Sequence, residues 1–272
     1  MNGKVFLVGA GPGSPDLLTV KALKVLQTAD VVLHDELIGS EILDLIPRTA
    51  QLRNVGKRCG RTSTPQHEIN SLLIAFASFG LTVVRLKGGD PSIFGRAGEE
   101  IDALRKAGVE FEIIPGVTSA LAAAAAAQIS LTRRNKASAV IFVAGRHANS
   151  EEQIAWHAYV ASGATLAIYM PGFNYQQTAD QLISAGLNPE TPCAIISRAS
   201  SREQQIHRTA VKHLHRAPRF SAPTLLLVGD VVGASSWEAI PKDAAAWDQT
   251  LDLSQMPNVP EFFASGRAAY RD

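Results

Sequence analysis

Short β-branched runs alternate with helical stretches along this chain, and that alternation limits its fold more than any other feature of the sequence. Runs typical of strands lie at residues 5–8, 31–33, 52–55, 82–86 and 111–114. Helical periodicity lies at residues 17–27, 66–79, 99–106 and 119–127. A chain that alternates strand and helix in this way builds a parallel sheet with helices on its faces. The first half of the chain is therefore predicted to be an α/β unit.

A second set of strands and helices follows and predicts a second α/β lobe. Strands are expected at residues 140–143, 166–169, 194–196, 207–214 and 224–228, the last two as an antiparallel pair, and helices at residues 151–161 and 178–185. The apolar pattern is interrupted near residue 130, so we place the first lobe in residues 1–130 and the second in residues 131–234. Residues 235–272 show little periodicity, and we expect a tail that is either weakly structured or packed on the second lobe.

The composition indicates a globular protein with neither a membrane nor a nucleic acid as its partner. Of the 272 residues, 46% are hydrophobic and 19% are charged, which suffices for one large or two modest cores. The longest apolar run, residues 121–127, is too short to cross a bilayer, and the first residues show no signal-peptide pattern. A cytoplasmic location is therefore expected. The formal net charge of +1 provides no general attraction for nucleic acid.

The cysteines and histidines do not predict a metal site. Cys59 and Cys193 are far apart in sequence and fit neither a metal-binding nor a redox spacing, so two reduced thiols are expected. His213 and His215 are close together but have no further ligand beside them in sequence. We therefore expect no bound metal.

The loop in residues 86–100, LKGGDPSIFGRAGEE, has the composition of a binding site. It joins the carboxyl end of an expected strand to an expected helix, where ligands of α/β sheets usually lie. The glycine pair at 88–89 allows positive φ and close approach of a ligand, while Pro91 removes a donor and stiffens the bend. Asp90 and Arg96 add one carboxylate and one guanidinium. An ordinary strand-to-helix turn is the alternative, but such a turn needs neither the glycine pair nor the Asp-Pro step.

Two further loops of this kind also follow expected strands. Residues 8–16 contain prolines where a dinucleotide loop needs free N–H groups, and they lack the Gly-Lys-Ser/Thr of a nucleoside triphosphate loop. They can still form one wall of a pocket. In residues 115–120, Thr118 or Ser119 can cap the following helix or offer a hydroxyl to a ligand.

Residues 48–67 form a cationic segment in a chain that is otherwise nearly neutral. The segment contains no acidic residue, and its basic residues are Arg48, Arg53, Lys57, Arg58 and Arg61. Such a segment suits an anionic ligand. The alternative is a solvated loop whose counter-charges come from elsewhere in the fold.

Seven short motifs in register resemble the uroporphyrinogen-III C-methyltransferases of the tetrapyrrole methylase family. The resemblance covers residues 5–232. Its motifs are VGAGPG at residues 8–13, HDEL at 34–37, GKR at 56–58, KGGDP with FGR and EE at 87–100, PGVTS at 115–119, YM at 169–170 and VGDVV at 228–232.

The resemblance implies an α/β, two-lobed tetrapyrrole methylase fold with the active site in the cleft between the lobes. It implies methyl transfer from S-adenosyl-L-methionine to rings A and B of uroporphyrinogen III, which gives precorrin-2, a precursor of siroheme and cobalamin, and S-adenosyl-L-homocysteine. It also implies a homodimer. By motif position it places around the cofactor Pro12, Gly88, Gly89, Asp90, Ile93, Thr118, Ser119, Met170 and Ala199. For Met170, core packing beside Tyr169 is the alternative.

The resemblance also implies catalytic and substrate-facing positions. Asp35 and Lys57 match the family's proton acceptor and proton donor, and Arg96 joins them facing the substrate. Asp35 can instead hold a ring N–H by a hydrogen bond, and Lys57 can simply pair with a carboxylate. The macrocycle carries eight carboxylates, which arginine binds well. The expected substrate-binding residues are Arg58, Arg61, Glu99, Arg133 and Arg134.

The chain departs from the family in a segment that is expected to face the substrate. Residues 126–134 read AAQISLTRR where the family commonly has YAGIPLTHR. This difference leaves the cofactor loops intact and alters the substrate side. Two alternatives to the favoured activity therefore stay open, namely methylation of a later precorrin and a tetrapyrrole-binding paralogue without turnover.

Overall fold

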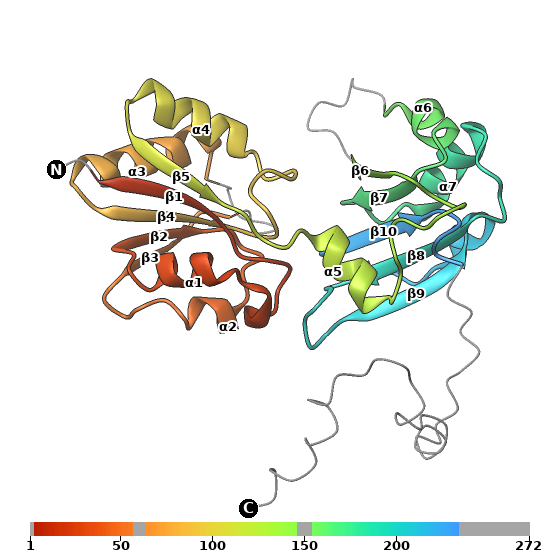
Figure 1. Cartoon of the computed structure of the whole chain (residues 1–272), viewed down its shortest axis with the longest axis horizontal. Coiled ribbons are helices and arrows are strands. Elements are labelled where there is room, and N and C mark those ends of the chain that lie inside the picture. The colour runs from red at the N-terminus through yellow and green to blue at the C-terminus, as the bar shows by residue number, and fades with distance from the viewer. Residues whose placement is uncertain (1–2, 57–63, 146–153, 234–272) are drawn as a thin grey trace, which may run out of the picture. The chain divides into compact units, whose positions relative to one another are not determined.

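The computed structural model describes residues 3–56, 64–145 and 154–233, which contain two five-stranded sheets (Figure 1). The first sheet is formed by strands within residues 4–114 and the second by strands within residues 140–228. Each sheet carries helices on its faces, so the two-lobed α/β fold predicted from the sequence is confirmed. The tail predicted for residues 235–272 lies outside the described residues.

The first sheet is wholly parallel and has the strand order β3-β2-β4-β1-β5. Its strands are β1 (Lys4–Gly9), β2 (Val31–His34), β3 (Gln51–Asn54), β4 (Thr82–Lys87) and β5 (Glu110–Ile114). The central strands β2 and β4 are buried on both faces, which accounts for the apolar runs at residues 31–33 and 83–84. Because all five strands run in one direction, the loops that follow them gather at one edge of the sheet.

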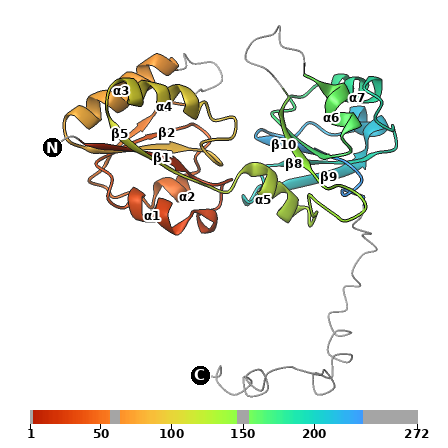
Figure 2. The ribbon, with the colours of Figure 1, turned by 45° about the horizontal axis from the view of Figure 1, so that its top comes forward.

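Two helices cover each face of the first sheet (Figures 1 and 2). One face carries α1 (Val20–Leu26) and α2 (Ser40–Leu43), and the other carries α3 (Gln66–Ser78) and α4 (Ala97–Lys106). The helix predicted at residues 17–27 begins later, because the Thr19 hydroxyl accepts the N–H of Ala22 over 3.1 Å and caps α1 there. The four-residue α2 was not predicted, because one turn carries too little periodicity to be recognised.

The second sheet has the strand order β6-β7-β10-β8-β9. Its strands are β6 (Val140–Ala144), β7 (Thr165–Tyr169), β8 (Pro192–Ser197), β9 (Gln205–Ala210) and β10 (Thr224–Val228). Strands β6 and β7 are parallel, and the other three pairings are antiparallel. The predicted pairing of the last two strands with each other is wrong, because β8 lies between them. The predicted strand at residues 207–214 is also too long, since η2 (Val211–Arg216) is a 3₁₀ helix that buries Val211 and Leu214 at a three-residue spacing.

The second sheet is covered on one face by α6 (Trp156–Ala161), α7 (Tyr175–Ser184) and η2, and on the other by α5 (Ser119–Ala126) (Figure 2). The predicted lobe boundary at residue 130 assigns α5 to the first lobe, whereas its buried alanines pack in the same core as Ala167 and Leu227 of the second sheet. Alanine side chains allow the helix to lie close to the strands. The boundary itself stays a prediction.

The described part of the chain contains one of the two cysteines, Cys193. Cys193 is fully buried in the core between the second sheet and the helices α6, α7 and η2, and this burial raises the pKa of its thiol to about 12. Cys59 lies outside the described residues. Within the described ranges, His, Cys, Asp and Glu side chains form no group of three or more arranged to hold a metal ion. The helices of the same ranges are all too short or too polar to cross a membrane.

Candidate functional site

The glycine-rich loops that follow β1, β4 and β5 contact one another through their backbones. Gly11 and Gly89 form an antiparallel bridge, in which the Gly89 N–H donates to the Gly11 carbonyl over 2.7 Å and the Gly11 N–H donates back over 3.1 Å. Gly116 lies so close that a Cβ there would come within 2.3 Å of the Gly89 carbonyl oxygen. The φ of Gly89 is +67°, a conformation that favours glycine. These glycines therefore allow three loops to meet at the carboxyl edge of the sheet.

Asp90 joins two of these loops through its carboxylate. Its Oδ1 accepts the N–H of Ser92 over 2.8 Å, within the loop after β4. Its Oδ2 accepts the N–H of Gly116 over 3.0 Å, in the loop after β5. The carboxylate that the sequence predicted to bind the cofactor therefore also fixes the protein backbone around the site.

Thr118 and Tyr169 connect the loop after β5 to the end of β7 in the second sheet. Thr118 holds the N-cap position of α5, but its hydroxyl makes no cap hydrogen bond and lies 2.6 Å from the Tyr169 hydroxyl. The same Tyr169 oxygen accepts the N–H of Ala120 over 3.2 Å, and the Phe94 ring lies 5.0 Å from the Tyr169 ring. Burial raises the pKa of Tyr169, so its phenol stays protonated in the neutral range.

A cavity lies at these loops, and all nine residues predicted around the cofactor line it. Among them, Met170 is half exposed with a φ of +50°, so the alternative of core packing beside Tyr169 is wrong. Sequence reasoning did not assign the other lining residues to the cofactor, although residues 37, 94 and 169 lie within motifs of the resemblance. These other lining residues are Leu37, Phe94, Tyr169, Ile196, Pro223, Thr224 and Leu225.

A larger cavity adjoins the first and shares Pro12, Leu37 and Pro223 with it. The first cavity has a volume of about 170 Å³ and the second about 730 Å³. Pockets for ligands of drug size or cofactor size usually measure about 300–1,000 Å³, so the two cavities together provide the space that such a ligand needs. The lining of the first is mostly apolar, with a few hydroxyls and exposed backbone, which suits a nucleoside with a methionine-like tail.

Asp35 follows β2 and is held by a cluster of buried charges. Its Oδ1 contacts Nη2 of Arg85. Arg85 in turn donates from Nε to Oε1 of Glu100 over 2.9 Å, and Lys87 donates to Oε2 of Glu100 over 2.8 Å. Sequence reasoning missed these partners of Asp35. The available signal was the presence of two basic residues, Arg85 and Lys87, in a strand that is otherwise apolar.

Arg96 already has a carboxylate partner, which is Glu99. The pair is bidentate, with Arg96 Nε 2.7 Å from Glu99 Oε1 and Nη2 2.8 Å from Oε2, and both side chains are about half exposed. The hydrogen bond to Glu99 raises the pKa of Arg96, and the same contact lowers the pKa of Glu99. A substrate carboxylate that binds Arg96 must therefore share the guanidinium with Glu99 or displace it.

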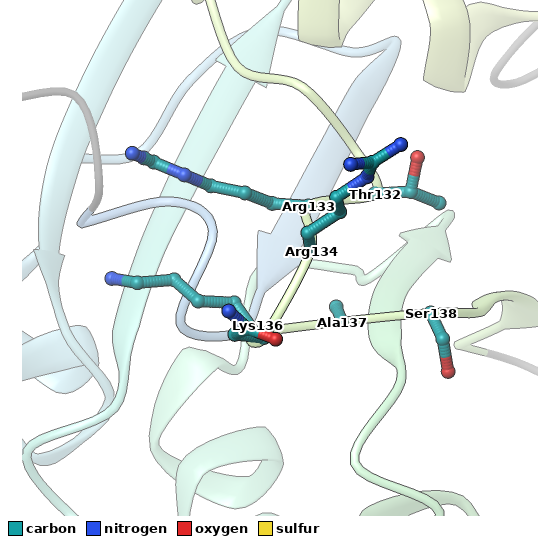
Figure 3. Close-up of a pocket in the computed structure, with 7 residues that line it drawn as sticks. Thr132, Arg133, Arg134, Lys136, Ala137 and Ser138 are labelled. Atoms are coloured by element: carbon teal, nitrogen blue, oxygen red, sulfur yellow. The ribbon is translucent and has the colours of Figure 1, made fainter.

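Arg133 and Arg134 lie in a tight turn and line a different cavity (Figure 3). The turn closes where the Arg133 N–H donates to the Ala137 carbonyl over 2.9 Å and the Ala137 N–H donates back over 3.0 Å. The side chains of Arg133 and Lys136 extend to the same side of the turn (Figure 3). The structure thus gathers the predicted cofactor residues in one place and these two arginines in another. Lys57, Arg58 and Arg61 lie outside the described residues.

Comparison with known proteins identifies a matching family model and similar sequences. Residues 4–215 match the family model of the tetrapyrrole (corrin/porphyrin) methylases. Siroheme synthase 1 of Pectobacterium atrosepticum is 46% identical over 231 residues, which cover 85% of this chain and 48% of the relative. Siroheme synthase of Psychromonas ingrahamii is 43% identical over 259 residues, which cover 95% of this chain and 53% of the relative. The chain therefore spans about half the length of the curated relatives it matches.

Solved structures show the same fold. A crystal structure of uroporphyrin-III C-methyltransferase from Thermus thermophilus, complexed with S-adenyl homocysteine, has a TM-score of 0.76 at 35% identity and covers 90% of this chain and 100% of that chain. Another crystal structure of uroporphyrin-III C-methyltransferase from the same organism has a TM-score of 0.74 at 40% identity, with the same coverage. A cobalt precorrin-4 methyltransferase has a TM-score of 0.75 at 30% identity and covers 84% of this chain and 95% of that chain.

Proposed function

Since this chain belongs to the tetrapyrrole (corrin/porphyrin) methylases, we propose that it transfers methyl groups from S-adenosyl-L-methionine to rings A and B of uroporphyrinogen III and so forms precorrin-2. The observation that carries the proposal is the cavity at the glycine-rich loops, whose lining includes all nine residues assigned to the cofactor by motif. The likeness of this chain to the uroporphyrin-III C-methyltransferase of Thermus thermophilus, one structure of which is complexed with S-adenyl homocysteine, supports the same cofactor class.

The residues of the cavity fit S-adenosyl-L-methionine. Ile93 and Met170 provide apolar contact, Thr118 and Ser119 provide hydroxyls, and a Cβ added to Gly88 would meet no protein atom within 4 Å. The cofactor supplies a methyl group on a sulfonium, which must not meet a strong protein nucleophile. The described lining of the cavity contains no cysteine, histidine or lysine. Backbone contacts join the three loops, and a lining held in this way favours in-line alignment of methyl donor and acceptor.

We propose that Asp35 and Arg96 act on the substrate side. The methylated macrocycle must lose a proton, and the Asp35 carboxylate, oriented by Arg85, accepts it directly or through water. Arg96 offers its planar guanidinium to a substrate carboxylate, while Glu99 orients it before the substrate binds. Arg58, Arg61, Arg133 and Arg134 as further carboxylate ligands, and Lys57 as proton donor, stay predictions.

The test is incubation of the purified protein with uroporphyrinogen III and S-adenosyl-L-methionine labelled in the methyl group. We expect label in a dimethylated product with the absorption and mass of precorrin-2. Label that enters only a later precorrin would support the second candidate, which is methylation of a later precorrin. The observation behind this candidate is the TM-score of 0.75 to cobalt precorrin-4 methyltransferase. Tetrapyrrole binding without transfer would identify a non-catalytic paralogue. The homodimer and the cytoplasmic location also stay predictions, and sedimentation of the purified protein tests the first of them.

A further inference from the structure

Four charged side chains form a largely buried cluster beneath the carboxyl edge of the first sheet. Arg85 and Lys87, on β4, are 3% and 2% exposed, and Glu100, in the first turn of α4, is fully buried. Asp35, which follows β2, completes the cluster at its partly exposed end. Two positive and two negative side chains make the cluster formally neutral.

Glu100 is the centre of this cluster. Its Oε1 accepts from Nε of Arg85 and from Nζ of Lys87, each over 2.9 Å, and from Nε2 of Gln66 over 3.2 Å. Its Oε2 accepts from Nζ of Lys87 over 2.8 Å. A buried carboxylate is costly unless it is paired in this way, and well-packed apolar side chains often give a protein as much stability as a buried ion pair. Stability alone therefore does not explain the cluster.

Arg85 carries the connection from Glu100 to Asp35. Its Nε is used by Glu100, its Nη1 donates to the carbonyls of Leu33 and Leu86, each over 3.3 Å, and its Nη2 contacts Oδ1 of Asp35. The guanidinium is planar, so fixing one edge on Glu100 and another on the β-strand carbonyls fixes the direction of the group that reaches Asp35. A lysine at this position cannot make these contacts at once.

We propose that Glu100 is a positioning residue for the methylation reaction: through Arg85 it fixes the orientation of the Asp35 carboxylate. The inference rests on the proposed function, in which Asp35 accepts the proton that the methylated ring loses. Lys87 provides the second positive charge of the cluster, so that two cations balance the two carboxylates. Burial lowers the pKa of Lys87, and Arg85 lowers it further, while Glu100 acts in the opposite direction.

The experiment is a double-mutant cycle on kcat with the full chain, using Glu100→Gln, Asp35→Asn and the double variant. Loss of orientation at a reacting group costs on the order of 10- to 100-fold in rate, so we expect Glu100→Gln to lower kcat by about that factor while changing the Kd for S-adenosyl-L-homocysteine less than about 3-fold. In the Asp35→Asn background, Glu100→Gln should have no further effect on kcat. Asp102→Asn, an exposed acid-to-amide change on the same helix, is the matched control and should leave kcat unchanged.

Additive losses in the double variant would overturn the proposal, because they would show that Glu100 does not act through Asp35. If Glu100→Gln does not fold, Arg85→Lys replaces it in the cycle, because this variant keeps the buried charge and loses the planar bridge. If the wild type does not methylate uroporphyrinogen III, hydrogen exchange decides the point without turnover. Faster exchange at residues 34–38 in Glu100→Gln, with β10 unchanged, supports the positioning role, and unchanged exchange at residues 34–38 contradicts it.

Discussion

The hydroxyl of Thr118, in the loop after β5, lies 2.6 Å from the hydroxyl of Tyr169 at the end of β7. Both residues line the cavity that carries the proposed function. The loop after β5 is also bound to Asp90 through the N–H of Gly116, over 3.0 Å. One segment of backbone therefore connects the loop after β4 in the first sheet with Tyr169 in the second, and substitutions at either end should change cofactor binding.

Replacing Tyr169 by phenylalanine removes the partner of the Thr118 hydroxyl and of the Ala120 N–H. A hydrogen bond contributes about 0.5–1.5 kcal/mol net, so we expect the Kd for S-adenosyl-L-homocysteine to rise about 2- to 12-fold, measured by isothermal titration calorimetry. Tyr159→Phe is the matched control, because Tyr159 packs beside Trp156 on the α6 and α7 face of the second sheet and does not line the cavity. An equal rise in both variants would show that the effect does not come from the cavity.

Asp90 permits a graded test, because each oxygen of its carboxylate accepts one backbone N–H, from Ser92 and from Gly116. Asp90→Ala leaves both donors without their acceptor and should lower the free energy of unfolding by about 1–3 kcal/mol and weaken cofactor binding. Asp90→Asn keeps one acceptor oxygen and should lose less of both. Urea unfolding and calorimetry measure the two quantities. An unaltered Kd in Asp90→Ala would place the cofactor elsewhere.

At Gly88, a larger side chain can fill the space for a ligand without disturbing the fold. A Cβ added there would meet no protein atom within 4 Å, and Gly88 is not among the residues with positive φ. Gly88→Ala should therefore change the free energy of unfolding by no more than about 1 kcal/mol. Because the added methyl group enters the cavity, the Kd for S-adenosyl-L-homocysteine should rise on the order of tenfold. Gly98→Ala, which also meets open space but lies in α4 outside the cavity lining, should likewise change the free energy of unfolding by no more than about 1 kcal/mol and should leave the Kd unchanged.

The sequence allowed prediction of most strands and, through the motifs of the resemblance, of nine of the residues that line the cavity. There is a physical reason for this. Buried parallel strands need continuous apolar runs, and loops that meet backbone to backbone need glycine, so both leave local marks such as those at β2 and at Gly116. Parallel strands also bring successive loops to one edge. The gathering of residues as far apart as Pro12 and Thr118 could therefore be expected before the structure was known.

The parts that were not predicted depend on pairing between distant side chains. Periodicity indicates that Arg85 lies in a buried strand, but it does not indicate that Glu100 and Asp35 are its partners. The same limit explains why the last two strands were paired with each other, since nothing in their composition shows that β8 lies between them. Asp90 was assigned to the cofactor by motif alone, and its bond to the Gly116 N–H could not be derived from sequence spacing.

Burial of Cys193 predicts both low reactivity and a pH-dependent contribution to stability. Its pKa is raised to about 12 in the folded protein, against about 8.5 for a free thiol. The protonated thiol therefore contributes stability that is fully present below pH of about 8.5 and is lost as the pH rises toward 12. We expect Cys193 to resist iodoacetamide at pH 8 in the folded protein and to react after unfolding in urea, as peptide mass spectrometry can show. Modification of Cys193 in the folded protein at the rate of a free thiol would contradict its burial.

Arg96 should affect methyl transfer and leave cofactor binding nearly unchanged, because its guanidinium is paired with Glu99 and does not line the cofactor cavity. Hydrogen bonds to charged groups contribute about 1.5–3 kcal/mol, so Arg96→Ala should lower kcat/KM for uroporphyrinogen III about 10- to 150-fold. Arg96→Lys keeps the charge but loses the bidentate geometry, so it should recover part of the loss. Calorimetry with S-adenosyl-L-homocysteine should give nearly the same Kd for all three proteins. A parallel loss of cofactor affinity would show that Arg96 supports the loop after β4 rather than the substrate.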